Sequence, residues 1–145
     1  MFPALKIGEL TATTPIVQGG MGVGISLSGL ASAVANEGGI GVIAGAMIGM
    51  LEPDVTKDPL GANIRALARE IKKAREKTKG IIGVNIMVAL TSFRDLVRTA
   101  LANSADVIFS GAGLPTDLPR HLLELCEEKK EEFKTKLIPI VSSAR

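Results

Sequence analysis

Residues 15–22 read Pro-Ile-Val-Gln-Gly-Gly-Met-Gly, a short apolar run that stops at a glycine-rich end. The apolar run predicts a buried β-strand, and the glycines after it predict a loop. Further apolar runs follow at residues 40–44, 81–88, 105–109 and 137–141. All five predicted strands are nearly apolar throughout, as expected of a parallel sheet that is covered on both faces.

A helix is predicted between each pair of consecutive strands, at residues 28–36, 62–79, 93–102 and 117–133. In the longest helix, apolar residues such as Leu67 and Ile71 recur at helical spacing, and charged residues that include Glu70 are assigned to the solvent-facing side. Ser28 is expected to cap the first helix. The order βαβαβαβαβ predicts an α/β fold with right-handed crossovers, in a single domain over residues 1–145.

The composition excludes several classes of protein. The chain has 145 residues, of which 46% are hydrophobic and 22% charged, as in a globular domain and unlike a disordered chain. A net charge of +2 and an aromatic content of 3% give no basis for nucleic-acid binding. Residues 10–36 carry no charge, but polar residues and glycines interrupt them, so we expect no membrane span. We expect a soluble cytoplasmic protein without a signal peptide.

Ligands of parallel α/β sheets bind beyond the carboxyl ends of the strands, and three of the four ends that can be read here are glycine-rich. These ends are residues 18–22, 44–46 and 110–113. Glycine lets the backbone approach a flat ring or a phosphate closely, and free backbone N–H groups bind anionic oxygens. At the fourth end, Asn85 interrupts an apolar strand, either as a structural residue with buried partners or as a ligand contact. Together the four ends predict a cofactor site.

Other sequence patterns are weaker indications of function. Residues 20–24 read Gly-x-Gly-x-Gly, which differs from the Rossmann fingerprint, and no acidic residue ends the second strand. An open, doubly wound sheet that binds a nucleotide stays an alternative. His121 is expected at the surface without a catalytic role, and Cys126 is expected in the core. No metal-ligand spacing occurs, so no metal site is predicted.

The segment at residues 15–22 resembles the opening motif of the nitronate monooxygenase family, formerly called 2-nitropropane dioxygenases, which includes the flavin-dependent enoyl-ACP reductases. Residues 31–41, 83–86 and 110–113 continue the resemblance. The resemblance implies an FMN-binding TIM (β/α)8 barrel, of which this chain would be the N-terminal part, an incomplete barrel domain with five strands and four helices. It also implies a flavin-dependent oxidoreductase that oxidises alkyl nitronates with O2 or, alternatively, reduces enoyl thioesters with NAD(P)H.

The resemblance further implies a set of cofactor-binding residues at the strand ends, which are Gly20, Met21, Gly22, Asn85, Met87 and Ser142. The backbone of the first three would lie against the flavin, and Asn85 would hydrogen-bond it. The catalytic histidine of the family follows a glycine pair at a later strand, so it is expected beyond the end of this chain, as is the FMN phosphate site. No catalytic residue is therefore assigned, and the chain alone is expected to bind FMN weakly or not at all and to have no turnover.

A five-strand piece of a barrel has two open edges, so we expect either self-association or a partner that supplies the C-terminal half of the barrel. A non-enzymatic half-barrel that acts as an assembly module is the alternative to an enzyme. The substrate that the resemblance implies is a small molecule, either a nitronate or an enoyl thioester.

Overall fold

The computed structural model describes residues 2–130 and 132–143, and its centre is a four-stranded parallel sheet in the order β3-β4-β5-β6. The strands are β3 (Ile40–Ala44), β4 (Ile81–Met87), β5 (Val107–Gly111) and β6 (Lys136–Pro139). Their order in space is their order in the sequence, as in neighbouring units of a (β/α) barrel. A doubly wound sheet reverses its strand order partway, so that alternative is wrong.

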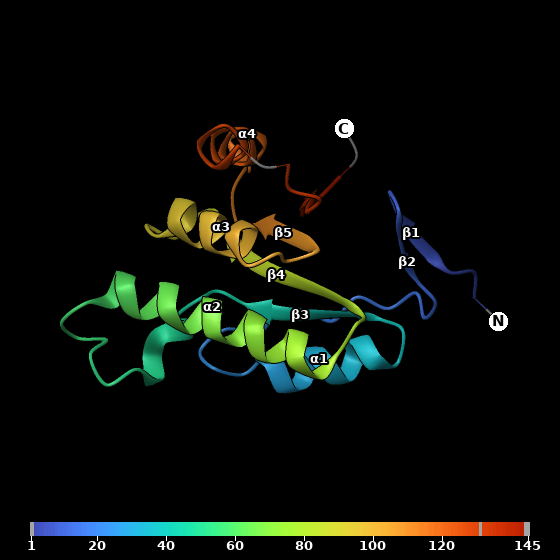
Figure 1. The fold of residues 1–145 in the computed structure, drawn as a ribbon, viewed down its shortest axis with the longest axis horizontal. Coiled ribbons are helices and arrows are strands. Elements are labelled where there is room, and N and C mark those ends of the chain that lie inside the picture. Colours follow the sequence, from blue (N-terminus) through green and yellow to red (C-terminus); the bar gives the residue numbers. More distant parts are fainter. Residues whose placement is uncertain (1, 131, 144–145) are drawn as a thin grey trace.

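Helices connect the strands and lie together on one side of the sheet (Figure 1). They are α1 (Ser28–Asn36), α2 (Pro59–Lys77), α3 (Phe93–Ala102) and α4 (Leu118–Lys129), and a short 3-10 helix, η1 (Ile48–Leu51), precedes α2. The bounds of α1, β3 and α3 confirm the predicted ranges. Helix α2 begins at Pro59 because Asp58 caps it, accepting a hydrogen bond from the Gly61 N–H at 2.9 Å.

Strands β3, β4 and β5 are largely buried on both faces, as their apolar sequences predicted, whereas β6 is only partly buried. On the helix side, alternate strand residues such as Ile43, Val84 and Ile108 pack against the apolar faces of the helices. On the opposite side, Val42 and Phe109 belong to a second, smaller core. All five residues of β3 are buried, so the strand shows no alternation between apolar and polar positions.

An antiparallel hairpin that the sequence did not predict covers the second core. It consists of β1 (Leu5–Ile7) and β2 (Leu10–Ala12), and it stands apart from the helices on the right of Figure 1. Its apolar side chains pack against Ile40 and Val107, near the amino ends of the strands. An ion pair of 2.7 Å between Glu9 and Lys136 joins the hairpin to β6. The hairpin therefore closes the end of the sheet that lies away from the glycine-rich loops.

The first predicted strand, at residues 15–18, pairs with β3 only as an isolated parallel bridge between Val17 and Ile40. It extends the strand order by one position, so that the sheet follows five successive units of a barrel. Helix α4 ends before the predicted Phe133, because Lys130 adopts a left-handed conformation with φ of 52°.

Candidate functional site

The loops that follow the strands meet at the carboxyl end of the sheet, where the sequence predicted a cofactor site. Backbone hydrogen bonds join the loops there. Gly45 donates to the Asn85 carbonyl at 2.8 Å, and Val88 donates to the Gly111 carbonyl at 2.8 Å. Because the strands are parallel and in register, these contacts bring the ends of β3, β4 and β5 to one rim.

Two glycines of the first loop lie directly against the neighbouring loops. A methyl group added at Gly20 would lie 2.8 Å from the Asn85 Cβ and 2.9 Å from its Nδ2. A methyl group at Gly22 would lie 2.9 Å from the Ala46 carbonyl oxygen. Gly19, by contrast, has no heavy atom within 4 Å of such a methyl group. Gly20 and Gly22 are therefore required for the close approach of this loop to its neighbours, because a side chain at either position would collide with them.

Ser26 holds the loop in a closed shape, a role that the sequence analysis did not assign. Its hydroxyl oxygen accepts a hydrogen bond from the Met21 N–H at 3.0 Å, and its own N–H donates to the Met21 carbonyl at 2.9 Å. Its carbonyl accepts from the Ala44 N–H at 3.0 Å. Val23 adopts a φ of 53°, which is strained for a β-branched residue, while its N–H donates to the Ala46 carbonyl at 3.0 Å.

This arrangement leaves specific donors free at the rim. Within the described residues, the N–H groups of Gly20 and Gly22 and the side-chain amide of Asn85 make no hydrogen bond, whereas the Met21 N–H is engaged by Ser26. Free backbone donors beside a stretch of backbone without Cβ atoms can hold a flat, polar heteroaromatic ring. The donor set therefore fits a flavin ring.

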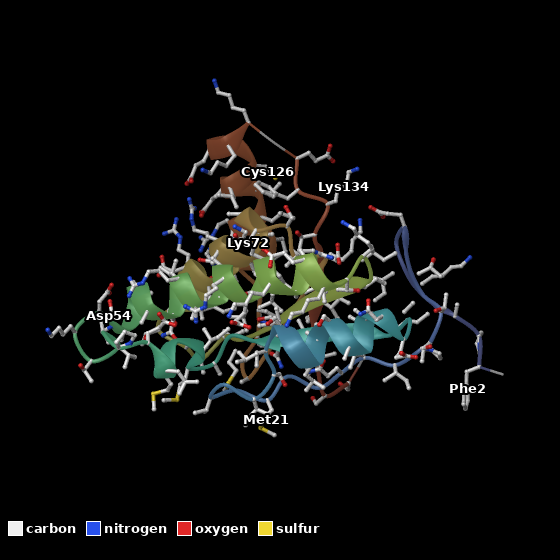
Figure 2. All side chains as sticks on the ribbon, turned by 60° about the horizontal axis from the view of Figure 1, so that its bottom comes forward. Phe2, Met21, Asp54, Lys72, Cys126 and Lys134 are labelled. Atoms are coloured by element: carbon white, nitrogen blue, oxygen red, sulfur yellow. The ribbon has the colours of Figure 1, made fainter. Side chains whose placement is uncertain are left out.

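The other predicted site residues are exposed and differ in where they lie. The Met21 side chain is 64% exposed and projects from the edge of the molecule in Figure 2. Met87 ends β4 and is 39% exposed, and Ser142 lies beyond β6 with an exposed side chain. No hydrogen bond within residues 2–130 and 132–143 joins Met87 or Ser142 to Gly20, Gly22 or Asn85. Of the predicted set, the structure brings Gly20 and Asn85 into direct contact.

A buried carboxylate supports the end of the loop, and here two predictions are wrong. Ser28 does not cap α1 with its side chain, and Glu70 of α2 does not face solvent. Instead the Ser28 N–H and hydroxyl both donate to Glu70 Oε2, at 3.1 and 2.6 Å. Burial raises the pKa of Glu70, but the bonds from Ser28 and the ammonium of Lys73 outweigh it, so that the pKa lies below its ordinary value. Glu70 thus caps α1 from a neighbouring helix.

The lone histidine is also placed differently from the prediction. His121 is buried rather than solvated, and its ring packs edge-on against Phe93 of α3, with 6.0 Å between the ring centroids. Its Nδ1 has no hydrogen-bond partner in the described part of the chain. It lies in the helix layer and not among the strand-end loops. Cys126, predicted in the core, is half-buried.

The described residues contain no group of three or more His, Cys, Asp or Glu residues that is placed to hold a metal ion. None of their helices combines the length and the hydropathy that a membrane crossing requires.

Comparison with known proteins assigns the chain to a family. Two solved structures resemble the chain, that of FabK from Thermotoga maritima (32% identity, TM-score 0.65) and that of a single-residue variant of the same protein (30%, 0.66). Each match covers 89% of this chain but only 34% and 36% of the other chain, so this chain spans about a third of their length. No curated protein matches. The family model described as nitronate monooxygenase matches residues 4–145, and the chain therefore belongs to the nitronate monooxygenase family.

Proposed function

We propose that this chain forms the flavin-facing wall of an FMN-dependent oxidoreductase, as one incomplete barrel domain of a cytoplasmic enzyme. The observation that carries the proposal is the contact of Gly20 with Asn85 at the carboxyl end of the sheet, which leaves two backbone N–H groups and an amide free at one point. Gly20 and Gly22 would donate hydrogen bonds to the ring, and Asn85 would bind and orient it.

In this proposal the flavin, when bound, supplies the redox chemistry by accepting electrons from one substrate and passing them to another. The residues of this chain bind the ring, orient it and exclude water from one of its faces. The exposed thioether of Met21 and the side chain of Met87 would cover apolar parts of the bound molecules. Ser142 would face the same site from the end of β6. We assign no proton-transfer residue to this chain, because His121 packs in the helix layer.

Oxidation of alkyl nitronates with O2 is the first candidate reaction, because the matching family model carries that name. Reduction of an enoyl thioester with NAD(P)H is the second. The two solved structures named above are of FabK, and flavin-dependent enoyl-ACP reductases belong to the family that the strand-end motifs resemble. A non-enzymatic assembly module is the remaining alternative, and it predicts no flavin at all.

The open edges of the sheet support a partner, either a second copy or a separate C-terminal half of a barrel. The test is to co-express the chain with the part of Thermotoga maritima FabK that lies beyond the matched third. We expect the co-purified complex to carry bound flavin, seen by visible absorbance, whereas the chain alone carries little. Flavin-dependent consumption of a nitronate or of NAD(P)H with an enoyl thioester then separates the two reactions.

The matched variants are Gly20→Ala and Gly19→Ala. Gly20→Ala places a methyl group against Asn85 and should abolish flavin retention, whereas the methyl group of Gly19→Ala meets no neighbour and should leave flavin retention intact. A complex that forms without flavin, or flavin retention that ignores Gly20→Ala, would refute the proposal. A chain that purifies alone with near-stoichiometric flavin would contradict the expectation of weak binding.

A further inference from the structure

Gln18 lies at the point where the first strand ends and the glycine loop begins. Its N–H donates to the Ile40 carbonyl at 3.0 Å, and the Ile40 N–H donates to the Ile16 carbonyl at 2.9 Å. In a regular parallel ladder, the next two hydrogen bonds would join the backbone of Val42 to the Gln18 carbonyl and to the Gly20 N–H. Neither of these backbone bonds occurs.

The side chain of Gln18 makes both bonds instead. Its Nε2 donates to the Val42 carbonyl at 3.0 Å, and the Val42 N–H donates to its Oε1 at 3.2 Å. A primary amide carries a donor and an acceptor in one plane, as a peptide group does. Glutamate lacks the donor, and leucine lacks both groups. The Gln18 amide therefore satisfies the Val42 backbone in place of the chain that would have continued the strand.

The Gln18 side chain, by replacing these backbone bonds, changes the path that the loop can take. Because the Val42 backbone is already satisfied, the chain can leave β3 directly after Gln18. It then reaches the end of β4, where Gly20 lies against Asn85, and the end of β3, where Gly22 lies against Ala46. A regular ladder would instead engage the Gly20 N–H with Val42 and hold this residue beside β3.

We propose that Gln18 is a positioning residue for the cofactor loop, because its side-chain amide replaces one step of the β-ladder and so keeps the Gly20 N–H free for a ligand. The identity of that ligand as a flavin rests on the proposed function, but the placement of the loop does not. Gln18 itself touches Val42 and is not a catalytic residue.

The experiment measures amide hydrogen exchange of the full chain, without any flavin, in Gln18→Leu and Gln18→Glu. The reporters are the N–H groups of Met21, Val23 and Ser26, whose hydrogen bonds exist only while the loop is in place. In Gln18→Leu we expect their protection to fall by at least about tenfold, while amides in β4 and β5 change by less than about twofold. The control is Ile71→Val, a buried change in α2 that lowers stability without touching the loop.

Gln18→Glu adds a readout that a loss of packing would not move. At about pH 8 its carboxylate cannot donate to the Val42 carbonyl, whereas near pH 4 a protonated carboxyl can donate again. Loop protection, corrected for the intrinsic pH dependence of exchange, should therefore recover in acid in this variant and not in Gln18→Leu. Unchanged loop protection in Gln18→Leu, equal losses across loop and sheet as in Ile71→Val, or no recovery in Gln18→Glu would each overturn the proposal.

A separate arm adds FMN to the co-expressed complex described above. If the wild-type complex binds no flavin, the proposed function fails, but the exchange result still decides the role of Gln18. If flavin binds and Gln18→Leu weakens its retention in parallel with the loss of loop protection, both inferences stand. If flavin retention is unchanged while the loop loses protection, the positioning role toward the cofactor is refuted.

Discussion

The buried carboxylate of Glu70 offers a direct test of how the candidate site is supported. Replacing Glu70 with alanine removes the acceptor of two donors, the N–H and the hydroxyl of Ser28, which lie 3.1 and 2.6 Å from Oε2. A buried donor left without a partner costs roughly 1–3 kcal/mol, and the start of α1 also loses the side-chain cap that Glu70 provides. We therefore expect Glu70→Ala to lower the free energy of unfolding by about 3 kcal/mol. Glu70→Gln keeps an acceptor oxygen and should lose about half as much.

The assay is urea unfolding followed by circular dichroism, with Glu76→Ala as the matched control. Glu76 lies on the exposed face of the same helix, and its side chain makes no ion pair or hydrogen bond in the described residues, so its loss should change stability by no more than about 0.5 kcal/mol. If Glu70→Ala and Glu76→Ala have the same free energy of unfolding, the Ser28 contacts do not stabilise the fold and the reasoning is refuted.

The pH dependence of the difference in unfolding free energy between the wild type and Glu70→Ala provides a second check. The pKa of Glu70 is lower in the folded chain than its ordinary value of 4.5. The stability from its carboxylate is therefore fully present above that ordinary value and is lost as the pH falls through the lower, folded value. The difference between the wild type and Glu70→Ala should be constant around neutral pH and should shrink only in acid. A difference that already declines near about pH 6 would point to another titrating group.

Gly41→Ala places a methyl group into the backbone of Ala31, which cannot move aside cheaply, so urea unfolding should show a loss of about 3 kcal/mol. Ser26→Ala removes the acceptor of the Met21 N–H, so the exchange of this amide should accelerate while global stability falls by only about 1 kcal/mol. Arg98→Ala breaks a solvent-accessible ion pair with Glu128 and should cost less than about 1 kcal/mol, a difference that added salt should diminish in thermal unfolding.

The positions of most elements could be predicted because each central strand is buried on both faces and therefore appears as an uninterrupted apolar run. The hairpin could not be predicted in this way. Its strands have three residues each, and Leu5-Lys6-Ile7 is too short to give a periodic signal. The hairpin packs beneath Ile40 and Val107, so its stability depends on contacts far away in the sequence.

The spacing of apolar residues in α2 does hold a signal for the burial of Glu70, so its assignment to the solvent-facing side was avoidable. Leu67, Ile71 and Ala74 define the buried stripe of α2, and position 70 falls on that stripe, three residues after Leu67 and four before Ala74. A charged residue on a buried stripe requires a partner, but the pattern cannot name one. The partner, Ser28, precedes it by 42 residues and belongs to another helix.

The same limit applies to the site itself, where the glycines predict close approach but not the group that is approached. The contact of Gly20 with Asn85 and the bonds of Gln18 to Val42 exist only because the parallel register places the strands side by side. The loop at residues 18–26 contains no charged residue and is held by amides, hydroxyls and backbone groups. Glu70 meets the chain only after the loop, so its charge can anchor the loop while leaving the donors of Gly20 and Gly22 available.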